Sequence, residues 1–149
     1  MKTLTYDDFS VGTVFSLATV VMNLDEMVEF SRRYDPQPFH LDATAGEQSL
    51  FGALCASGWH TCLLWMRAWV DGVVSRVAAT GSPGISDLRW LAPVFPGDLL
   101  IAGAEVLSAR VSKSRPHLGL VSVRGTMHRG ESSVMQMDSI LMIELGQRP

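Results

Sequence analysis

Hydrophobic residues follow two different periods along this chain, one in each half. Segment 13–21 is rich in β-branched and apolar residues, a composition typical of a strand. The apolar residues that follow recur at helical spacing, and Asn23 stands directly before them as a helix-capping residue. This helix must end near Tyr34, because the residue before Pro36 is pushed out of helical geometry. We therefore predict a strand over 13–21 and a helix over 24–34.

A second and longer apolar segment covers residues 58–74. Its apolar side chains lie nearly all round the helical circumference, which is typical of a helix that is buried on most sides. The polar residues His60, Arg67 and Asp71 fall on one narrow stripe, and the last two have the i,i+4 spacing of an ion pair. We expect one long helix at the centre of the molecule.

From Gly84 onward the pattern changes to strand-like runs separated by turn residues. Long strands that are joined by short turns favour an antiparallel sheet. Helices in the front half and strands in the back half give an α+β pattern, and 149 residues suit a single domain over 1–149. A long sheet curved around one apolar helix would satisfy both halves. The predicted strands are 85–94, 99–110, 118–127 and 133–145.

The composition narrows the range of partners. An apolar fraction of 47% and a mean hydropathy of +0.19 are high, and excess apolar surface often marks a subunit contact. A net charge of −3 argues against nucleic acid or an anionic membrane as the main partner, and no apolar run reaches the roughly 18 residues of a membrane span. The first residues lack a signal-peptide core. Cys55 and Cys62 are expected to be free thiols, which favours the cytoplasm.

Candidate chemistry is concentrated in the segment 34–42. It holds Asp35 and His40 five residues apart, and two nearby prolines should prevent a helix and stiffen a short loop. A carboxylate and an imidazole that share one water form an outline of a general acid–base site. Two simpler interpretations stand beside this one: Asp35 caps the turn before Pro36, and His40 is a structural loop histidine.

A metal site is not expected. Asp42 and His40 could be two ligands, but no third histidine or cysteine has suitable spacing, and Asp42 is better placed to cap the short segment that follows it. Ser57 does not lie in the glycine-flanked pattern of a hydrolase nucleophile, so we expect it to start the central helix.

Several motifs together resemble a known family. They cover almost the whole chain in the family's order, and with them the sequence resembles the MaoC-like (R)-specific enoyl-CoA hydratases and dehydratases. The resemblance implies the hot-dog fold, a curved antiparallel β-sheet wrapped around a long central α-helix, usually as a dimer. The motifs are Tyr34-Asp35-Pro36-Gln37-Pro38-Phe39-His40-Leu41-Asp42, Phe51-Gly52, Ala56-Ser57-Gly58-Trp59-His60-Thr61 and Leu88-Arg89-Trp90-Leu91-Ala92-Pro93-Val94-Phe95-Pro96-Gly97-Asp98.

The resemblance also implies roles for individual residues. The family's catalytic acid corresponds to Asp35, its histidine to His40, and its oxyanion-hole glycine to Gly58, whose backbone N–H would face the thioester oxygen. The family commonly has Asn at the position of Gln37 and His at the position of Ser57. We expect these two residues to contribute to substrate binding and to distinguish this chain from its relatives.

The implied activity is that of a hydro-lyase. It would add water reversibly to a trans-2-enoyl-CoA thioester, as in fatty acid metabolism, with an Asp/His dyad and no cofactor, because coenzyme A belongs to the substrate. A homodimer or higher homo-oligomer is expected. The alternatives are an acyl-CoA thioesterase of the same fold, in which Asp35 activates water against the carbonyl, and a non-catalytic binder of acyl thioesters. Thioesterases of this fold usually carry a lone acid on the central helix, where this chain has only Asp71, near the far end.

Overall fold

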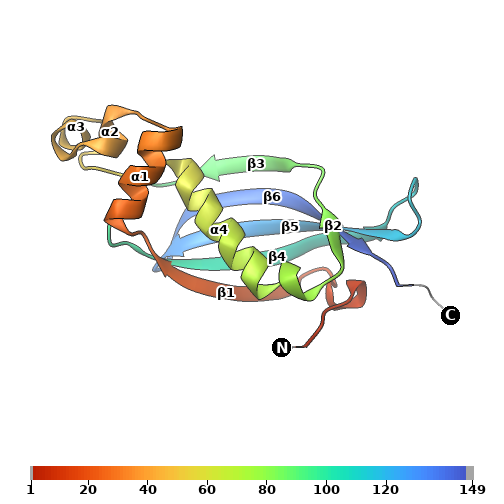
Figure 1. The fold of residues 1–149 in the computed structure, drawn as a ribbon. Helices are drawn as coiled ribbons and strands as arrows, with labels where there is room; N and C mark the ends of the chain where they lie inside the picture. The colour runs from red at the N-terminus through yellow and green to blue at the C-terminus, as the bar shows by residue number, and fades with distance from the viewer. Residues whose placement is uncertain (1, 147–149) are drawn as a thin grey trace.

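Six antiparallel strands form one sheet, and a single long helix lies across its face (Figure 1). The computed structural model describes residues 2–146, and the predicted α+β hot-dog fold is confirmed. The strand order is β1-β4-β5-β6-β2, and β3 also pairs with β6. The elements are η1 (Tyr6–Asp8), β1 (Val14–Val21), α1 (Leu24–Tyr34), α2 (Pro38–Leu41), α3 (Ala43–Glu47), α4 (Gly58–Gly72), η2 (Val74–Arg76), β2 (Ala79–Gly81), β3 (Ile85–Trp90), β4 (Leu99–Val111), β5 (Leu118–Arg129) and β6 (Ser132–Glu144).

Three long strands, β4, β5 and β6, form the body of the sheet. Their alternating burial follows the two-residue period of a strand, which turns every second side chain toward α4. In β5 the core positions include Val121, Val123 and Met127, all buried.

Within residues 2–146 no helix has the length and apolar character needed to cross a membrane.

The central helix α4 is anchored to the sheet by tryptophan. Trp65 is fully buried, stacks on Trp69 with ring centroids 5.7 Å apart, and donates its indole N–H to the carbonyl oxygen of Gly103 at 2.8 Å. The ring occupies space that a side chain at Gly125 would need. Truncating a buried tryptophan of this kind costs about 3–5 kcal/mol. These contacts fix α4 against the middle of the sheet.

One side of α4 is not covered, contrary to the prediction of a helix buried on most sides. Trp59 and Leu63 are 53% and 54% exposed, and Met66 and Val70 continue the same exposed stripe. The predicted polar stripe also divides. Arg67 and Asp71 are exposed, but His60 is buried beneath α1, so that packing by a neighbouring helix, and not polarity, decides its environment.

The two predicted helix caps are present, but the short helix α2 was not predicted. Asn23 caps α1 by accepting a bond from the Glu26 N–H, and Asp42 caps α3 in the same way, as predicted. The prediction that prolines exclude a helix from segment 34–42 is wrong. Pro38 is the first residue of α2, where a missing N–H costs nothing, because first-turn donors have no partner inside the helix. The short strand β2 was not predicted.

Candidate active site

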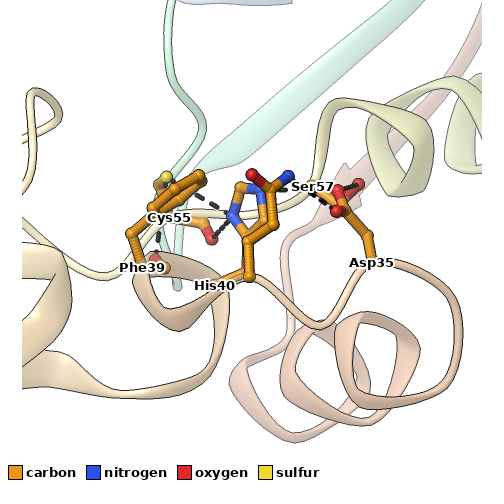
Figure 2. Close-up of polar contacts among 6 residues, drawn as sticks. Asp35, Phe39, His40, Cys55 and Ser57 are labelled. Carbon is orange, nitrogen blue, oxygen red and sulfur yellow. Dashed lines mark hydrogen bonds and ion pairs between the residues drawn. The ribbon is translucent and has the colours of Figure 1, made fainter.

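Asp35 is held at the exit of α1. Its backbone N–H donates to the carbonyl oxygen of Ser31 at 2.9 Å, and the chain then leaves helical geometry before Pro36. The carboxylate accepts two short hydrogen bonds, one on each oxygen. Gln37 Nε2 donates to Oδ1 at 2.7 Å and Ser57 Oγ donates to Oδ2 at 2.7 Å (Figure 2). The carboxylate is therefore fixed from both sides.

Opposing effects set the pKa of Asp35. Partial burial raises the pKa of this carboxyl, but the hydrogen bonds from Ser57 and Gln37, together with the nearby His40, outweigh it and hold the pKa below its usual value. Asp35 is thus a carboxylate at neutral pH. An ionised carboxylate can accept a proton or a hydrogen bond from water, and it cannot donate one.

His40 faces Asp35 from the buried side of α2. Its Nδ1 lies 2.8 Å from the carbonyl oxygen of Cys55, and because a carbonyl only accepts, we assign the proton to Nδ1. In the neutral ring, Nε2 is then an acceptor, and it lies 3.5 Å from Asp35 Oδ2. Two acceptors that face each other can both be satisfied by one water, which donates one hydrogen to each.

The segment that leads into α4 completes this arrangement. Cys55 donates its N–H to the carbonyl oxygen of Phe39 in α2, and Ala56 donates to that of Val94, beyond β3. Gly58 then begins α4, and within residues 2–146 its N–H has no hydrogen-bond acceptor. A helix N-terminus carries a partial positive charge, so this N–H is a suitable donor to an anionic oxygen.

A cavity of about 440 Å³ brings these groups together. Asp35, His40 and Gly58 all line it, so the three residues surround one space. Part of its lining is buried and mainly apolar, and part is exposed; we call the buried part the deep lining and the exposed part the outer lining. The deeper residues include Ala56, Thr61, Val94 and Val134, and the outer ones include Gln37, Phe51, Trp59, Trp90 and Leu91.

Gln37 and Ser57 both hold Asp35 in this structure. Gln37 lines the cavity, while Ser57 is fully buried and directs its hydroxyl to the carboxylate. Their expected contribution to substrate binding stays a prediction. Among the residues weighed for other roles, Asp42 caps α3, and Asp71 forms a surface ion pair with Arg67 at 2.6 Å and does not line the cavity.

Two residues of the site escaped the sequence analysis as contributors. Cys55 fixes the His40 tautomer through its backbone carbonyl, which no side-chain pattern can reveal. Trp90 lies at the end of β3 and meets Gly58 only because the sheet and α4 approach each other there. Within the described residues, no group of three or more His, Cys, Asp or Glu side chains could hold a metal ion.

Fold and site together define a hot-dog domain with an acid–imidazole pair at the start of its central helix. The family model described as MaoC like domain matches residues 8–126. A MaoC-like dehydratase from Rhodospirillum rubrum is 34% identical, with 96% of this chain and 97% of that chain covered and a TM-score of 0.86. The chain belongs to the MaoC-like domain family.

Two proteins of lower sequence identity also match, one by structure and one by sequence. The (R)-hydratase from A. caviae, which is involved in PHA biosynthesis, is 20% identical, with 91% of this chain and 96% of that chain covered and a TM-score of 0.70. The uncharacterised protein YdeM of Bacillus subtilis is 24% identical over 139 residues, which are 93% of this chain and 97% of YdeM. The solved structure supports the fold, and YdeM is itself uncharacterised.

Proposed function

We propose that this chain is a hydro-lyase that adds water reversibly to a trans-2-enoyl-CoA thioester. The observation that supports it most is the pair of Asp35 Oδ2 and His40 Nε2, 3.5 Å apart in a cavity that Gly58 also lines. Hydration of an enoyl thioester needs a held water, a proton carrier and a donor to the thioester oxygen. These three groups could supply all of them.

In the proposed reaction the pair orients the attacking water. The water donates to Asp35 Oδ2 and to His40 Nε2, which leaves a lone pair free to attack C3 of the substrate. As the new C–O bond forms, the double-bond electrons move toward C2 and the carbonyl oxygen, and one member of the pair takes the proton from the water.

The second half of the reaction returns a proton to C2. The developing enolate oxygen would accept a hydrogen bond from the Gly58 N–H, aided by the positive end of α4. The pair then delivers a proton to C2, so that H and OH have been added across the double bond and the pair is restored. The same steps in reverse dehydrate a 3-hydroxyacyl thioester, and no cofactor enters either direction.

We further propose that two copies of this chain associate through α4. The exposed stripe of Leu63, Met66 and Val70 runs along one side of this helix and does not line the cavity, and covering such a row of apolar side chains with a partner is favourable. A second copy presents the same stripe and can meet it about a two-fold axis. A homodimer would also account for the high apolar fraction of the sequence.

The cytoplasm remains the compartment that we propose. Both cysteines are free and buried, and burial raises the pKa of the Cys55 thiol, which disfavours oxidation through the thiolate. A chain with two free thiols suits a reducing environment.

The direct test is turnover of a panel of trans-2-enoyl-CoA substrates that differ in chain length and branching. Hydration removes the enoyl-thioester absorbance, and chiral analysis of the product assigns its stereochemistry. The same samples are assayed for free thiol, because a thioesterase would release coenzyme A while a hydratase would not. Thiol release without hydration would replace the proposal by hydrolysis, and inertness with tight binding would favour a binder.

A further inference from the structure

Trp90 covers the first turn of α4. A Cβ atom built on Gly58 would lie 2.4 Å from Cε2 and Nε1 of the indole, so the ring occupies the space of any side chain at this position. One turn further, burial raises the pKa of the Cys62 thiol, and a hydrogen bond with the Trp90 side chain lowers it in part. Gly58 and Cys62 are small residues on the same face of the helix, and the indole packs over them.

Trp59 and Trp90 form an aromatic pair at the outer part of the cavity. Their ring centroids lie 5.2 Å apart in an edge-to-face arrangement, and both rings line the cavity. About half of each side chain is exposed, 53% for Trp59 and 47% for Trp90, whereas the deep lining residues are buried. The aromatic pair therefore belongs to the exposed part of the cavity lining.

The proposed reaction fixes which part of a substrate would meet this pair. C3 of the enoyl group must reach the water between Asp35 and His40, and the carbonyl oxygen must reach the Gly58 N–H. The sulfur is bonded to the carbonyl carbon on the side away from C3, so it passes Gly58 and comes beside the indole of Trp90. The group attached to sulfur is long and polar at its far end, and it must leave through the exposed side of the cavity.

We propose that the aromatic pair Trp59 and Trp90 binds the pantetheine arm of the substrate just beyond the thioester sulfur. This assignment rests on the proposed hydratase function. Sulfur makes favourable contacts with aromatic rings, and the methylenes that follow it can lie on a flat apolar surface. The deep apolar residues then contact the acyl group, and the two ends of the substrate are recognised by different parts of the cavity.

The test compares two thioesters that share one acyl group, crotonyl-pantetheine and S-methyl thiocrotonate. We expect Trp90→Ala to lower kcat/KM for crotonyl-pantetheine about tenfold and to leave that for S-methyl thiocrotonate within about twofold. Trp59→Ala should act in the same direction, and Trp90→Phe should retain part of the preference because a flat ring remains. Ile85→Ala is the matched control: Ile85 lies on the same strand, is 50% exposed and does not line the cavity.

An equal loss with both thioesters would overturn the assignment, because it would mean that Trp90 only packs against α4. No loss with either thioester would overturn it as well. If the unaltered protein hydrates neither compound, calorimetry with butyryl-pantetheine and S-methyl thiobutyrate decides. If Trp90→Ala binds only the pantetheine ester more weakly than the unaltered protein does, the assignment holds although the hydratase proposal fails. If the variant and the unaltered protein bind this ester equally, or neither binds it, the assignment is rejected.

Discussion

At the scale of single residues, the candidate site holds one carboxylate and one imidazole, and neighbouring groups fix the charge of the first and the tautomer of the second. Asp35 is kept ionised by the donors on its two oxygens, and His40 is kept in one tautomer by the Cys55 carbonyl. Neither effect comes from the reactive group itself. The partners of Asp35 are side chains that can be substituted, whereas the partner of His40 is a backbone carbonyl.

Removing either member of the pair should abolish turnover without unfolding the chain. We expect Asp35→Asn and His40→Ala to lower kcat for enoyl-CoA hydration by about 10²–10⁴-fold, because the first removes a carboxylate that can take a proton and the second removes the imidazole acceptor of the water. Circular dichroism and thermal unfolding would verify that both variants are folded. Turnover near that of the unaltered protein in either variant would show that the water is activated elsewhere.

Removing the hydroxyl of Ser57 should change the pH dependence of turnover. This hydroxyl donates to Asp35 and helps to lower the pKa of that carboxyl, so Ser57→Ala should raise it. If turnover requires ionised Asp35, the acid limb of the kcat/KM profile moves to higher pH. A higher KM with an unmoved acid limb would instead support the expected substrate-binding role of Ser57. Gln37→Ala provides the parallel case on the other carboxylate oxygen.

At the scale of elements, the packing of α1 on α4 positions Asp35 and contains an unusual histidine. His60 is buried, its ring stacks on Phe30 of α1 at 4.9 Å, and its Nδ1 has no partner among residues 2–146. Burial lowers the pKa of His60, and the nearby Glu26 raises it only in part. The folded protein therefore prefers His60 without its proton.

This preference predicts how stability changes with pH. The unfolded chain binds a proton at His60 near pH 6.5, while the folded chain binds it only at lower pH, so the contribution of His60 is lost as pH falls below 6.5 and levels off below the folded pKa. The variant His60→Phe keeps the stacked ring and has no titrating group. Its free energy of unfolding should fall less between pH 7 and pH 5 than that of the unaltered protein, as measured by urea denaturation at each pH. Parallel curves would contradict the burial of a neutral His60.

The sequence was most informative where a contact is local in the chain. Asn23 and Asp42 each bond to an N–H three residues ahead, so their caps could be predicted from spacing alone. The same local reasoning failed at Pro38, because a proline that interrupts a helix interior also suits a first helical turn. The contact of Trp90 with Gly58 joins β3 to α4 and has no counterpart in local spacing.

At the scale of the whole molecule, the fold leaves one apolar side of its central helix uncovered. The sheet covers the side that carries Trp65 and Trp69, and the α1 end covers His60, but nothing within residues 2–146 covers Leu63 and Met66 to the same degree. The family resemblance implied a dimer, and periodicity alone implied a buried helix. A second copy against α4 would reconcile the two, since the helix would be buried in the assembly.

A charge placed in this stripe should separate the proposed dimer. We expect Leu63→Glu to weaken self-association by about 100-fold, because pairing across a two-fold axis would bring two carboxylates together without counter-charges. Light scattering coupled to size-exclusion chromatography gives the mass directly. Arg67→Glu, at another exposed position of the same helix, controls for the added charge. If the unaltered protein is a monomer, there is no such dimer. If the Leu63→Glu variant stays dimeric, the subunit contact lies elsewhere.

The contact between Gly58 and Trp90 has a consequence for how this sequence can change over time. Gly58→Ala alone should cost about 1–3 kcal/mol, since its methyl group meets the indole, and Trp90→Ala in the same chain should recover part of that loss. A double-mutant cycle of unfolding free energies measures this coupling, and strictly additive effects would refute it. If the two residues are coupled, a relative with a larger residue at the position of Gly58 should carry a smaller one at the position of Trp90. The two positions would then covary among relatives, although they are 32 residues apart in the sequence.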